Sequence, residues 1–484
     1  MIFAYHKAAR MFELCSLERT GLQSRFVDKR LERRYERINA SLEKRQSSIL
    51  NQVSAQRSER KAGYDFFHNA RVPEQTLRAR IYERLMKGSA YYAGQHLLVL
   101  SDTTEYNYAF NKTRLRDISS FGTLTNEHGL GYFAHVSMVM NQADLSLIGL
   151  SDIQIWHREQ GRPGAHTRKK RFFEDKESYK WYASLYNSHQ RLQRAGSVTY
   201  VQDRDGDIYE SICKVKDIQG ADLVVRNCRD RKIELEDGTR LMLYGHLAAQ
   251  CVDFTYELKI KADKRKNRTT RLAQLEVRSQ RVKLVCPEQV KKYNPASSWV
   301  DVVWVREASH SVPAGESPID WKLITTHQVA GHRTKAAQII AWYESRWLLE
   351  EFFFITKTGA YDLEHALLES SDGLRKLGIM VMDNATKILQ LRQARQGQTD
   401  LQADAVFDEK EQRYIEKILP SLEGKTEKLK NPYPINSLAR AAWVIARLGG
   451  WKGYATSRLP GMQTFKRGLD KFNTMVFAWE MDSS

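Results

Sequence analysis

Three acidic residues could together hold divalent metal ions for a reaction on phosphate esters. Asp102 follows a short apolar run at residues 97–100, Asp203 follows a second one at 197–201, and Glu350 lies on a predicted helix. Carboxylate oxygens without His or Cys suit Mg²⁺ or Mn²⁺, which keep open positions for water and phosphate. Two such ions about 3.5–4 Å apart would activate an attacking oxygen and stabilise a leaving one. The acids therefore predict phosphodiester chemistry, provided that folding brings them together.

Each aspartate also has a simpler interpretation. Aspartates at strand ends are common in turns, where the side chain bonds to the nearby backbone. The run DRDGDIYE after residue 202 also invites comparison with a calcium-binding loop. However, Gly206 stands at the fourth place instead of the sixth, and Lys214 stands at the twelfth instead of Glu. The sequence excludes the calcium loop and leaves the turn interpretation open.

Glu350 shares one face of its predicted helix with other polar side chains. If residues 341–360 form a helix at about 100° per residue, Tyr343, Arg346, Glu350 and Lys357 fall in one narrow stripe. Apolar residues lie on the opposite side. An ordinary surface helix shows the same division, so the stripe by itself is compatible with a solvated face.

The elements around these residues predict an α/β core. Apolar runs at 97–100, 132–140 and 145–156 are expected to form an antiparallel meander, with the first strand ending before Asp102. A helix at 176–193 and a strand at 197–201 follow. Three meandering strands, a helix and a returning strand, with acids after the first and fourth strands, are the order of a ribonuclease-H-like fold.

The rest of the chain predicts two helical regions and a β-rich insertion. Residues 1–85 are rich in Arg and Lys before an aromatic cluster, a pattern typical of a nucleic-acid-binding module and also of solvated helices. Residues from about 213 to 327 alternate short strands with turns, and residues 370–484 are helical again. The catalytic core therefore spans 86–369. The insertion carries a basic loop, whose simpler interpretation is a solvated hairpin tip, with Lys264, Arg265, Lys266 and Arg268.

Composition favours a polyanionic partner in a reducing compartment. The 484 residues suggest roughly two to four domains, and their net charge is 76 − 58 = +18, with a pI near 9.5. Lys and Arg set against phosphates release condensed counterions, although a ribosomal protein would have the same balance. The five cysteines form no C-x-x-C pair, which argues against a disulfide framework and a structural zinc site. With no signal peptide or membrane span in the sequence, we expect a cytoplasmic protein.

The residues of the stripe also resemble a known family. Their spacing matches the Tyr-(2)-Arg-(3)-Glu-(6)-Lys signature of bacterial insertion-sequence transposases of the DDE type, a group that includes the cut-and-paste transposase of a kanamycin-resistance transposon. SDTTEYNY, VTYVQDRDGDIY and RWLLEEF followed by KTGA resemble the segments around the family's three acids. SERKAGYDFF resembles its DNA-binding region, KESYKW a segment before its second strand, and IARLGGW its carboxyl-terminal domain. The likeness covers nearly the whole chain in family order.

The resemblance implies a role for each matching residue. Asp102, Asp203 and Glu350 would hold two Mg²⁺ or Mn²⁺ ions per active site when DNA is bound. Tyr343, Arg346 and Lys357 would contact phosphates at the transposon end. The remaining implied DNA contacts are Trp321, which would stack on a base flipped from the duplex, and Arg226 on the insertion.

The resemblance has two departures. Where the best-known member has a further lysine, four residues after the catalytic glutamate, this chain has Phe354. One phosphate contact is therefore absent or replaced by an apolar contact with a base or sugar. Asp205 and Gly206 stand where glutamate and alanine are usual.

The implied activity is excision and integration of an insertion sequence. The enzyme would cut double-stranded DNA at terminal inverted repeats, pass through a hairpin, and join the 3′ ends to target DNA. A homodimer, formed through the carboxyl-terminal domain and associated with the bacterial nucleoid, would hold both ends. Two alternatives stay open: a catalytically inactive DNA-binding inhibitor or domesticated copy, and a nuclease that only hydrolyses.

Overall fold

The computed structural model describes residues 23–54, 56–126, 128–159, 171–260, 262, 268–395, 397, 399–454 and 458–482. Its strands are β1 (His96–Asn107), β2 (Gly122–Thr123), β3 (Leu130–Asn141), β4 (Leu147–Trp156), β5 (Ser197–Gln202), β6 (Ala221–Arg226), β7 (Lys232–Glu234), β8 (Arg240–Met242), β9 (Phe254–Ile260), β10 (Arg271–Val285), β11 (Ser297–Glu307) and β12 (Asp320–Thr325). In this part of the chain they form one mixed sheet of twelve strands, in the order β2-β3-β1-β5-β6-β12-β11-β10-β7-β8. Strand β4 lies beside β3 and β9 beside β10.

The antiparallel meander predicted from the sequence is confirmed, but its first strand is longer than predicted. β1 pairs with β3 from Leu97 opposite Asn141 to Asn107 opposite Gly131, and β3 in turn pairs with β4. Asp102 therefore lies inside β1, and the prediction that the strand ends before it was wrong. The polar half of β1 stays extended because β3 continues to supply hydrogen-bond partners beyond the apolar run.

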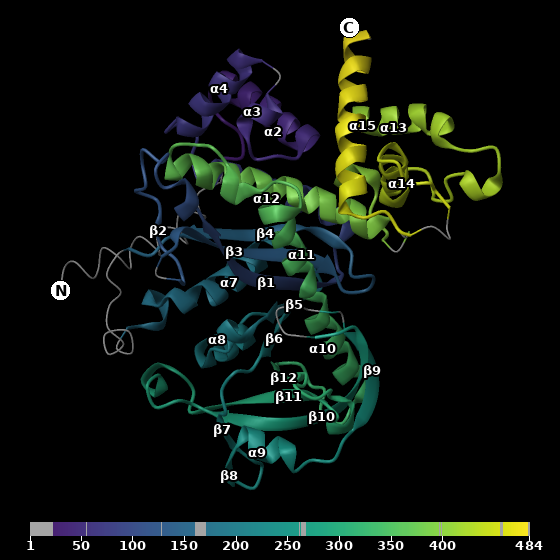
Figure 1. Cartoon of the computed structure of the whole chain (residues 1–484). Helices are drawn as coiled ribbons and strands as arrows, with labels where there is room; N and C mark the ends of the chain where they lie inside the picture. The colour runs from purple at the N-terminus through teal and green to yellow at the C-terminus, as the bar shows by residue number, and fades with distance from the viewer. Residues whose placement is uncertain are drawn as a thin grey trace.

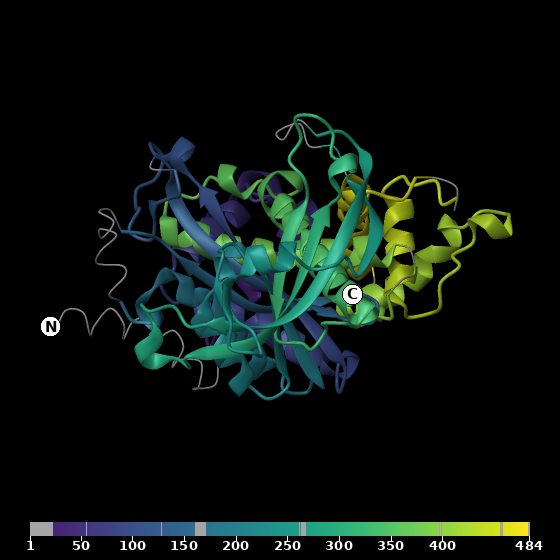
Figure 2. The same ribbon diagram turned by 90° about the horizontal axis from the view of Figure 1, so that it is seen from below.

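The central strands are parallel where β1 meets β5 and β5 meets β6. The predicted helix at 176–193 begins with a 3₁₀ turn, so that the α-helix itself is α7 (Lys180–Arg191). Strand β12 then pairs antiparallel with β6 and with β11, so the β-rich segment continues the same sheet. Figure 2, a view of the molecule from below, shows these strands.

Helices cover both faces of the sheet (Figure 1). Besides α7, the helices of the described residues are α2 (Lys29–Arg45), α3 (Leu50–Val53), α4 (Arg57–His68), α5 (Glu74–Lys87), α8 (Tyr209–Lys214), α9 (Leu243–Ala248), α10 (Arg333–Ser345), α11 (Trp347–Phe354), α12 (Ser371–Ala394), α13 (Glu409–Leu422), α14 (Leu438–Leu448) and α15 (Met462–Asp482). Helix α7 packs on one face through small side chains, with Ser137 Oγ of β3 bonded to both Ser101 and Ser184. Helices α5 and α12 pack on β4 from the other face.

Helix α12 joins the amino-terminal and carboxyl-terminal helices to the sheet. It is buried along most of its length and contacts α2, α4, α5, α14 and α15. Ion pairs fix this packing: Arg84 of α5 bonds to Asp383, and Arg375 bonds to Glu74 at 2.7 Å. Helices α13–α15 lie at one side of the molecule in both views (Figure 1, Figure 2).

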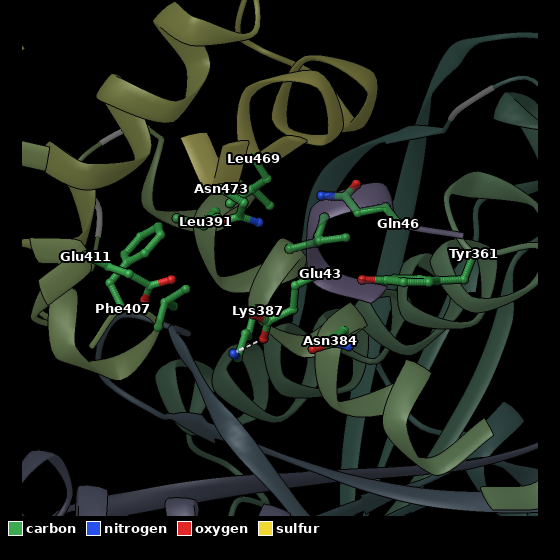
Figure 3. A pocket seen from close by; sticks show the side chains of 12 residues that line it. Glu43, Gln46, Tyr361, Asn384, Lys387, Leu391, Phe407, Glu411, Leu469 and Asn473 are labelled. Carbon is green, nitrogen blue, oxygen red and sulfur yellow. Dashed lines mark hydrogen bonds and ion pairs between the residues drawn. The ribbon is translucent and has the colours of Figure 1, made fainter. Parts of the chain in front are cut away.

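A small cavity lined by both polar and apolar side chains lies where α2, α12, α13 and α15 meet. The ion pair between Lys387 and Glu43 lies on its wall, with Glu411 across from it (Figure 3). The amide group of Gln46 is buried there and has no hydrogen-bond partner in the described part of the chain. The junction of these helices therefore depends on buried charges as well as on apolar packing. Among the described residues, no helix is long and apolar enough to cross a membrane.

Candidate active site

Four neighbouring strands each bring one of the predicted site residues to one region on the same face of the sheet. The parallel pairing of β1 with β5 ends at Ser101 opposite Gln202, so the next residues on the two strands are Asp102 and Asp203. Gln202 lies opposite Val225, which places Arg226 beside Asp203 on β6. Trp321 follows on β12. Residues far apart in the sequence therefore form one row across β1, β5, β6 and β12.

The helix that carries Glu350 is not continuous, contrary to the prediction of a single helix over 341–360. Helix α10 ends at Ser345, Arg346 forms a tight turn, and α11 begins at Trp347. In that turn the Arg346 N–H donates to the Tyr343 carbonyl oxygen at 3.1 Å, a three-residue step instead of four. A π-helical turn follows at Ile355–Gly359. The uniform 100° rotation assumed from the sequence therefore fails on both sides of α11.

Arg346 contacts all three predicted acids. One terminal nitrogen donates to Asp102 Oδ2 at 2.6 Å. The other donates to Glu350 Oε1 at 3.4 Å and lies 3.8 Å from Asp203 Oδ2. The guanidinium side chain is 11% exposed, so these contacts are only weakly screened by solvent. The two aspartates and the glutamate thus converge on a single buried cation.

The two aspartates have opposite pKa shifts. Burial raises the pKa of Asp102 to about 6, against the attraction of Arg346 and with a smaller contribution from the negative charges of Asp203 and Glu350. Burial also acts on Asp203, but Arg346, the Arg204 N–H and Tyr343 outweigh it and lower the pKa of Asp203. Carboxyl groups whose pKa values are pushed apart in one cluster are typical of functional sites, although structural ion pairs do the same.

Tyr343 connects the helix to the row of strand residues. Its hydroxyl donates to Asp203 Oδ1 at 3.0 Å, and its ring meets the edge of Trp321 with 5.7 Å between centroids. Burial, followed by the charge of Asp203, raises the pKa of Tyr343 to about 12, so it remains a hydrogen-bond donor at neutral pH. The positive charge of Arg226 opposes that shift, which shows that Arg226 faces the same pair.

Lys357 lies beside the far half of β1, away from the three acids. Its ammonium group is 3.8 Å from Glu364 Oε1 and 5.4 Å from the ring centre of Tyr106. Tyr106 is four residues beyond Asp102 on the same strand, roughly 13 Å away at about 3.3 Å per residue. The polar stripe of the sequence is therefore split into a cluster at Arg346 and a separate cation at Lys357.

The remaining predicted contacts lie elsewhere. Lys264, Arg265 and Lys266 are outside the described residues, whereas Arg268 is partly buried just before β10. Phe354, the departure from the family pattern, is 52% exposed at the end of α11. Trp347 at the start of the same helix is 57% exposed. An apolar side chain thus stands at each end of the helix that carries Glu350.

A buried network missed by sequence reasoning holds the turn after Asp203. Asp207 accepts hydrogen bonds from Arg231 Nε at 3.1 Å, from the Asn227 side chain at 3.0 Å and from the Cys228 N–H at 3.1 Å. Arg231 also donates to the Asp207 carbonyl oxygen at 2.8 Å. The network ties the Asp203 turn to the segment after β6, close to Arg226. Nothing in the spacing of Asp207 and Arg231 distinguishes them from ordinary surface charges.

The acids of this cluster fit a hard divalent ion in donor type, but their side chains point to Arg346. In the part of the chain that the structure describes, no three His, Cys, Asp or Glu side chains are grouped closely enough to share one metal ion. The donor set of Asp102, Asp203 and Glu350 nevertheless consists only of carboxylate oxygens, which Mg²⁺ and Mn²⁺ prefer. Glu350 is 46% exposed, so one of the three oxygen donors is open to solvent.

One comparison with known families bears on the amino-terminal helices. Residues 17–72 match the family described as transposase DNA-binding. Within the described residues, this segment contains α2, α3 and α4, whose exposed faces carry many Arg and Lys side chains. The match supports DNA as a partner and a transposase as the class of protein.

Proposed function

We propose that the chain is a DDE-type transposase that cuts an insertion sequence at its terminal inverted repeats and joins the 3′ ends to target DNA. The observation that carries this proposal is the row of acids: Asp102 and Asp203 on adjacent parallel strands, with Glu350 joined to both through Arg346. The transposase DNA-binding match at residues 17–72 supplies the substrate class.

The same fold elements support a ribonuclease-H-like catalytic core. The strands β4, β3, β1, β5 and β6 are neighbours in that order, with the meander antiparallel and β1, β5 and β6 parallel. In this proposal residues 1–85 bind DNA, 86–369 form the core with its β-rich insertion at about 213–327, and 370–484 mediate homodimerisation. Two subunits would hold the two transposon ends together.

Asp102, Asp203 and Glu350 would hold the metal ions, two per active site when DNA is bound. When bound, Mg²⁺ or Mn²⁺ supplies charge stabilisation to the attacking and leaving oxygens of an in-line displacement. Asp203 is suited to this role because its lowered pKa keeps it ionised at neutral pH. The Asp102 carboxyl, with a pKa of about 6, is mostly ionised above pH 7.

Arg346 would change partners when DNA enters. Its Nε is buried without a hydrogen-bond partner among the described residues, and a phosphate oxygen would supply the missing acceptor. Tyr343 and Arg346 would hold the phosphate next to the acids, and Lys357 a phosphate farther along β1. Trp321 would stack on a base turned out of the duplex. Arg226 and the basic loop of the β-rich insertion would contact the sugar–phosphate backbone of the DNA.

Each step would be the same displacement with a different oxygen. Water attacks the phosphorus at the transposon end and the 3′-oxygen leaves as a hydroxyl. That hydroxyl attacks the opposite strand and forms a hairpin while the 3′-oxygen of the flanking DNA leaves. A second water opens the hairpin and frees the transposon 3′-hydroxyl, which then attacks target DNA while a target 3′-oxygen leaves. One set of residues serves all four steps because the reacting phosphate occupies the same position each time.

The test is metal-dependent cleavage of DNA that carries the element's own inverted repeats. Purified protein should cut it only with Mg²⁺ or Mn²⁺, and Asp203→Asn should abolish cleavage while retaining DNA binding. Asp205→Asn, two residues farther in the same turn and outside the ion-pair cluster, serves as the matched control and should cut normally. Full cleavage by the Asp203→Asn variant would remove the assignment.

The second candidate is a DNA-binding protein without catalysis, such as an inhibitor of transposition. It is favoured by one observation: Arg346 contacts all three acids and so could neutralise them permanently. Binding without any metal-dependent product would support this candidate. Nicked products without joined products would instead indicate a nuclease that only hydrolyses.

A further inference from the structure

The segment between β1 and β2 exposes an unusual set of side chains. Most side chains from Phe110 to Arg116 are exposed: Phe110 is 85% exposed, and Lys112, Thr113, Arg114 and Arg116 are exposed as well. A large aromatic side chain so exposed gives little stability to the fold, since it removes little apolar surface from water, although its ring meets that of His365 with 6.0 Å between centroids. We call residues 110–116 the basic loop of β1.

This loop is held rigidly although its side chains face solvent. The Asn111 side chain donates to the carbonyl oxygens of Glu364 at 3.1 Å and Ala366 at 3.4 Å. The Arg116 N–H donates to the Glu369 carbonyl oxygen at 2.8 Å. Just beyond the loop, Asp117 accepts from the hydroxyl of Ser371, the first residue of α12. The exposed side chains are therefore presented on a fixed backbone, which lowers the entropy lost on binding.

The loop lies beside the helices that match the transposase DNA-binding family. Helix α4, inside the matched segment, packs on α12 (Figure 1). At the start of α12, Phe67 lies against Gly373. The loop is bonded to the same start of α12. Burial raises the pKa of Tyr64 on α4; Arg60 of its own helix and Arg114 of the loop oppose the rise, whereas Glu369 adds to it. Arg60 and Arg114 therefore face a common surface.

The negative charges near this surface leave most of its cations without a carboxylate partner. Glu369 pairs with Arg116 at 2.7 Å, and Glu364 is engaged by the Asn107 N–H and lies near Lys357. Within the described residues, no carboxylate pairs with Arg60, Lys112 or Arg114. Glu59 and Asp65 of α4 are the other acids on that helix. A polyanion is the partner that such a surface fits.

We infer that the basic loop of β1 and α4 together form a binding surface for the sugar–phosphate backbone of duplex DNA. Lys112 and Arg114 contact phosphates, and Phe110 makes an apolar contact with a sugar or base edge. The end of β1 at Asn107 is roughly 17 Å from Asp102 at about 3.3 Å per residue, about half a turn of B-DNA, and the loop begins three residues farther on. A duplex held by α4 with its end at Asp102 crosses this loop. The direction of that path rests on the proposed function, whereas the contact itself does not.

The test uses DNA binding without any metal. Binding of the full chain to a fluorescein-labelled 40-base-pair duplex of mixed sequence is measured by anisotropy, in EDTA, across a series of KCl concentrations. Each phosphate contact contributes about 0.9 to the slope of log K against log salt concentration, so Lys112→Ala with Arg114→Ala should flatten the slope by about 1.8. The affinity should fall on the order of tenfold per contact near 0.1 M salt.

Further variants distinguish a specific DNA contact from a general loss of charge or of folding, because each has its own expected effect on the slope and on the affinity. Arg114→Lys should retain the parental slope, and Phe110→Ala should lower the affinity while leaving the slope unchanged. The control pair Lys425→Ala with Lys428→Ala removes the same charge from an exposed turn of the carboxyl-terminal region and should leave the slope unchanged.

Two outcomes would overturn the inference: an unchanged slope in the Lys112 and Arg114 pair, or an equal flattening in the control pair. The Asp203→Asn variant should bind with the parental slope. If that variant still cleaves DNA, the proposed function fails while the slope result stands, so the two failures are distinguishable.

Discussion

Removal of Arg231 is the most direct way to test how the turn after Asp203 is held. The Asp207 side chain is fully buried and that of Arg231 is 7% exposed, so Arg231→Ala leaves a buried carboxylate without its counter-charge. Breaking a buried pair in this way costs about 3–5 kcal/mol. Asn227 and the Cys228 N–H still donate to Asp207, which places the expected cost near 3 kcal/mol. We expect the turn to open locally and Asp203 to lose its position.

Amide hydrogen exchange of the segment around Cys228 measures that opening, because the Cys228 N–H itself donates to Asp207. A cost of about 3 kcal/mol predicts exchange more than a hundredfold faster, at about 1.4 kcal/mol per factor of ten. DNA cleavage should fall while DNA binding is retained.

Arg240→Ala is the matched control, since Arg240 pairs with Glu234 on the next hairpin and is 68% exposed. Such a surface pair is worth about 1 kcal/mol or less, so its exchange should change no more than fivefold. Asp207→Asn added to Arg231→Ala should recover part of the loss, because no unpaired charge remains. Exchange in Arg231→Ala within fivefold of the parent would refute the reasoning.

Two further predictions concern the helices around α12. Burial, and then the charge of Glu43, raises the pKa of Glu411 to about 7 from an ordinary 4.5, so the folded state holds that proton more tightly than the unfolded state does. The free energy of unfolding should therefore fall as the pH rises from about 4.5 to 7, by at most about 3 kcal/mol. Glu411→Gln should make the thermal midpoint less dependent on pH between pH 5 and 8. Equal pH profiles for parent and variant would contradict this assignment. Separately, a Cβ at Gly468 would lie 1.9 Å from the Ile445 carbonyl oxygen, so Gly468→Ala should push α15 off α14 and cost about 1–3 kcal/mol or more in a thermal melt. Gly461→Ala, with open space around it, should melt like the parent.

The sequence was informative wherever local pattern decides structure. Apolar runs identified β1, β3, β4 and β5, and the acids that follow two of those runs stand side by side in the fold. Pattern alone could not locate the end of β1, because the polar residues after Ser101 stay extended only through pairing with β3. That partner lies some thirty residues away along the chain, beyond the reach of local signals.

The site was less accessible to sequence reasoning than the strands were. Helical periodicity placed Lys357 beside Glu350, but the turn at Arg346 and the π-helical turn after Phe354 break that periodicity. The resemblance to a family identified Tyr343 and Arg346 as site residues without indicating that Arg346 contacts all three acids. Nothing in the sequence distinguishes Asp207 and Arg231 from surface charges, since only their burial in the folded protein sets them apart.

Because β1 and β5 pair in a fixed parallel register, the chain tolerates changes of length in the segments that connect the strands but not within β1. The spacing of Asp102 and Asp203 is fixed by pairing that ends at Ser101 and Gln202. Insertions or deletions in the connections between these strands can therefore change the length of the chain without moving the two carboxylates apart. A single residue inserted within β1 before Asp102 would instead turn its side chain to the α7 face. We expect natural relatives to vary in the connecting segments and to keep the strand segment from His96 to Asp102 free of insertions.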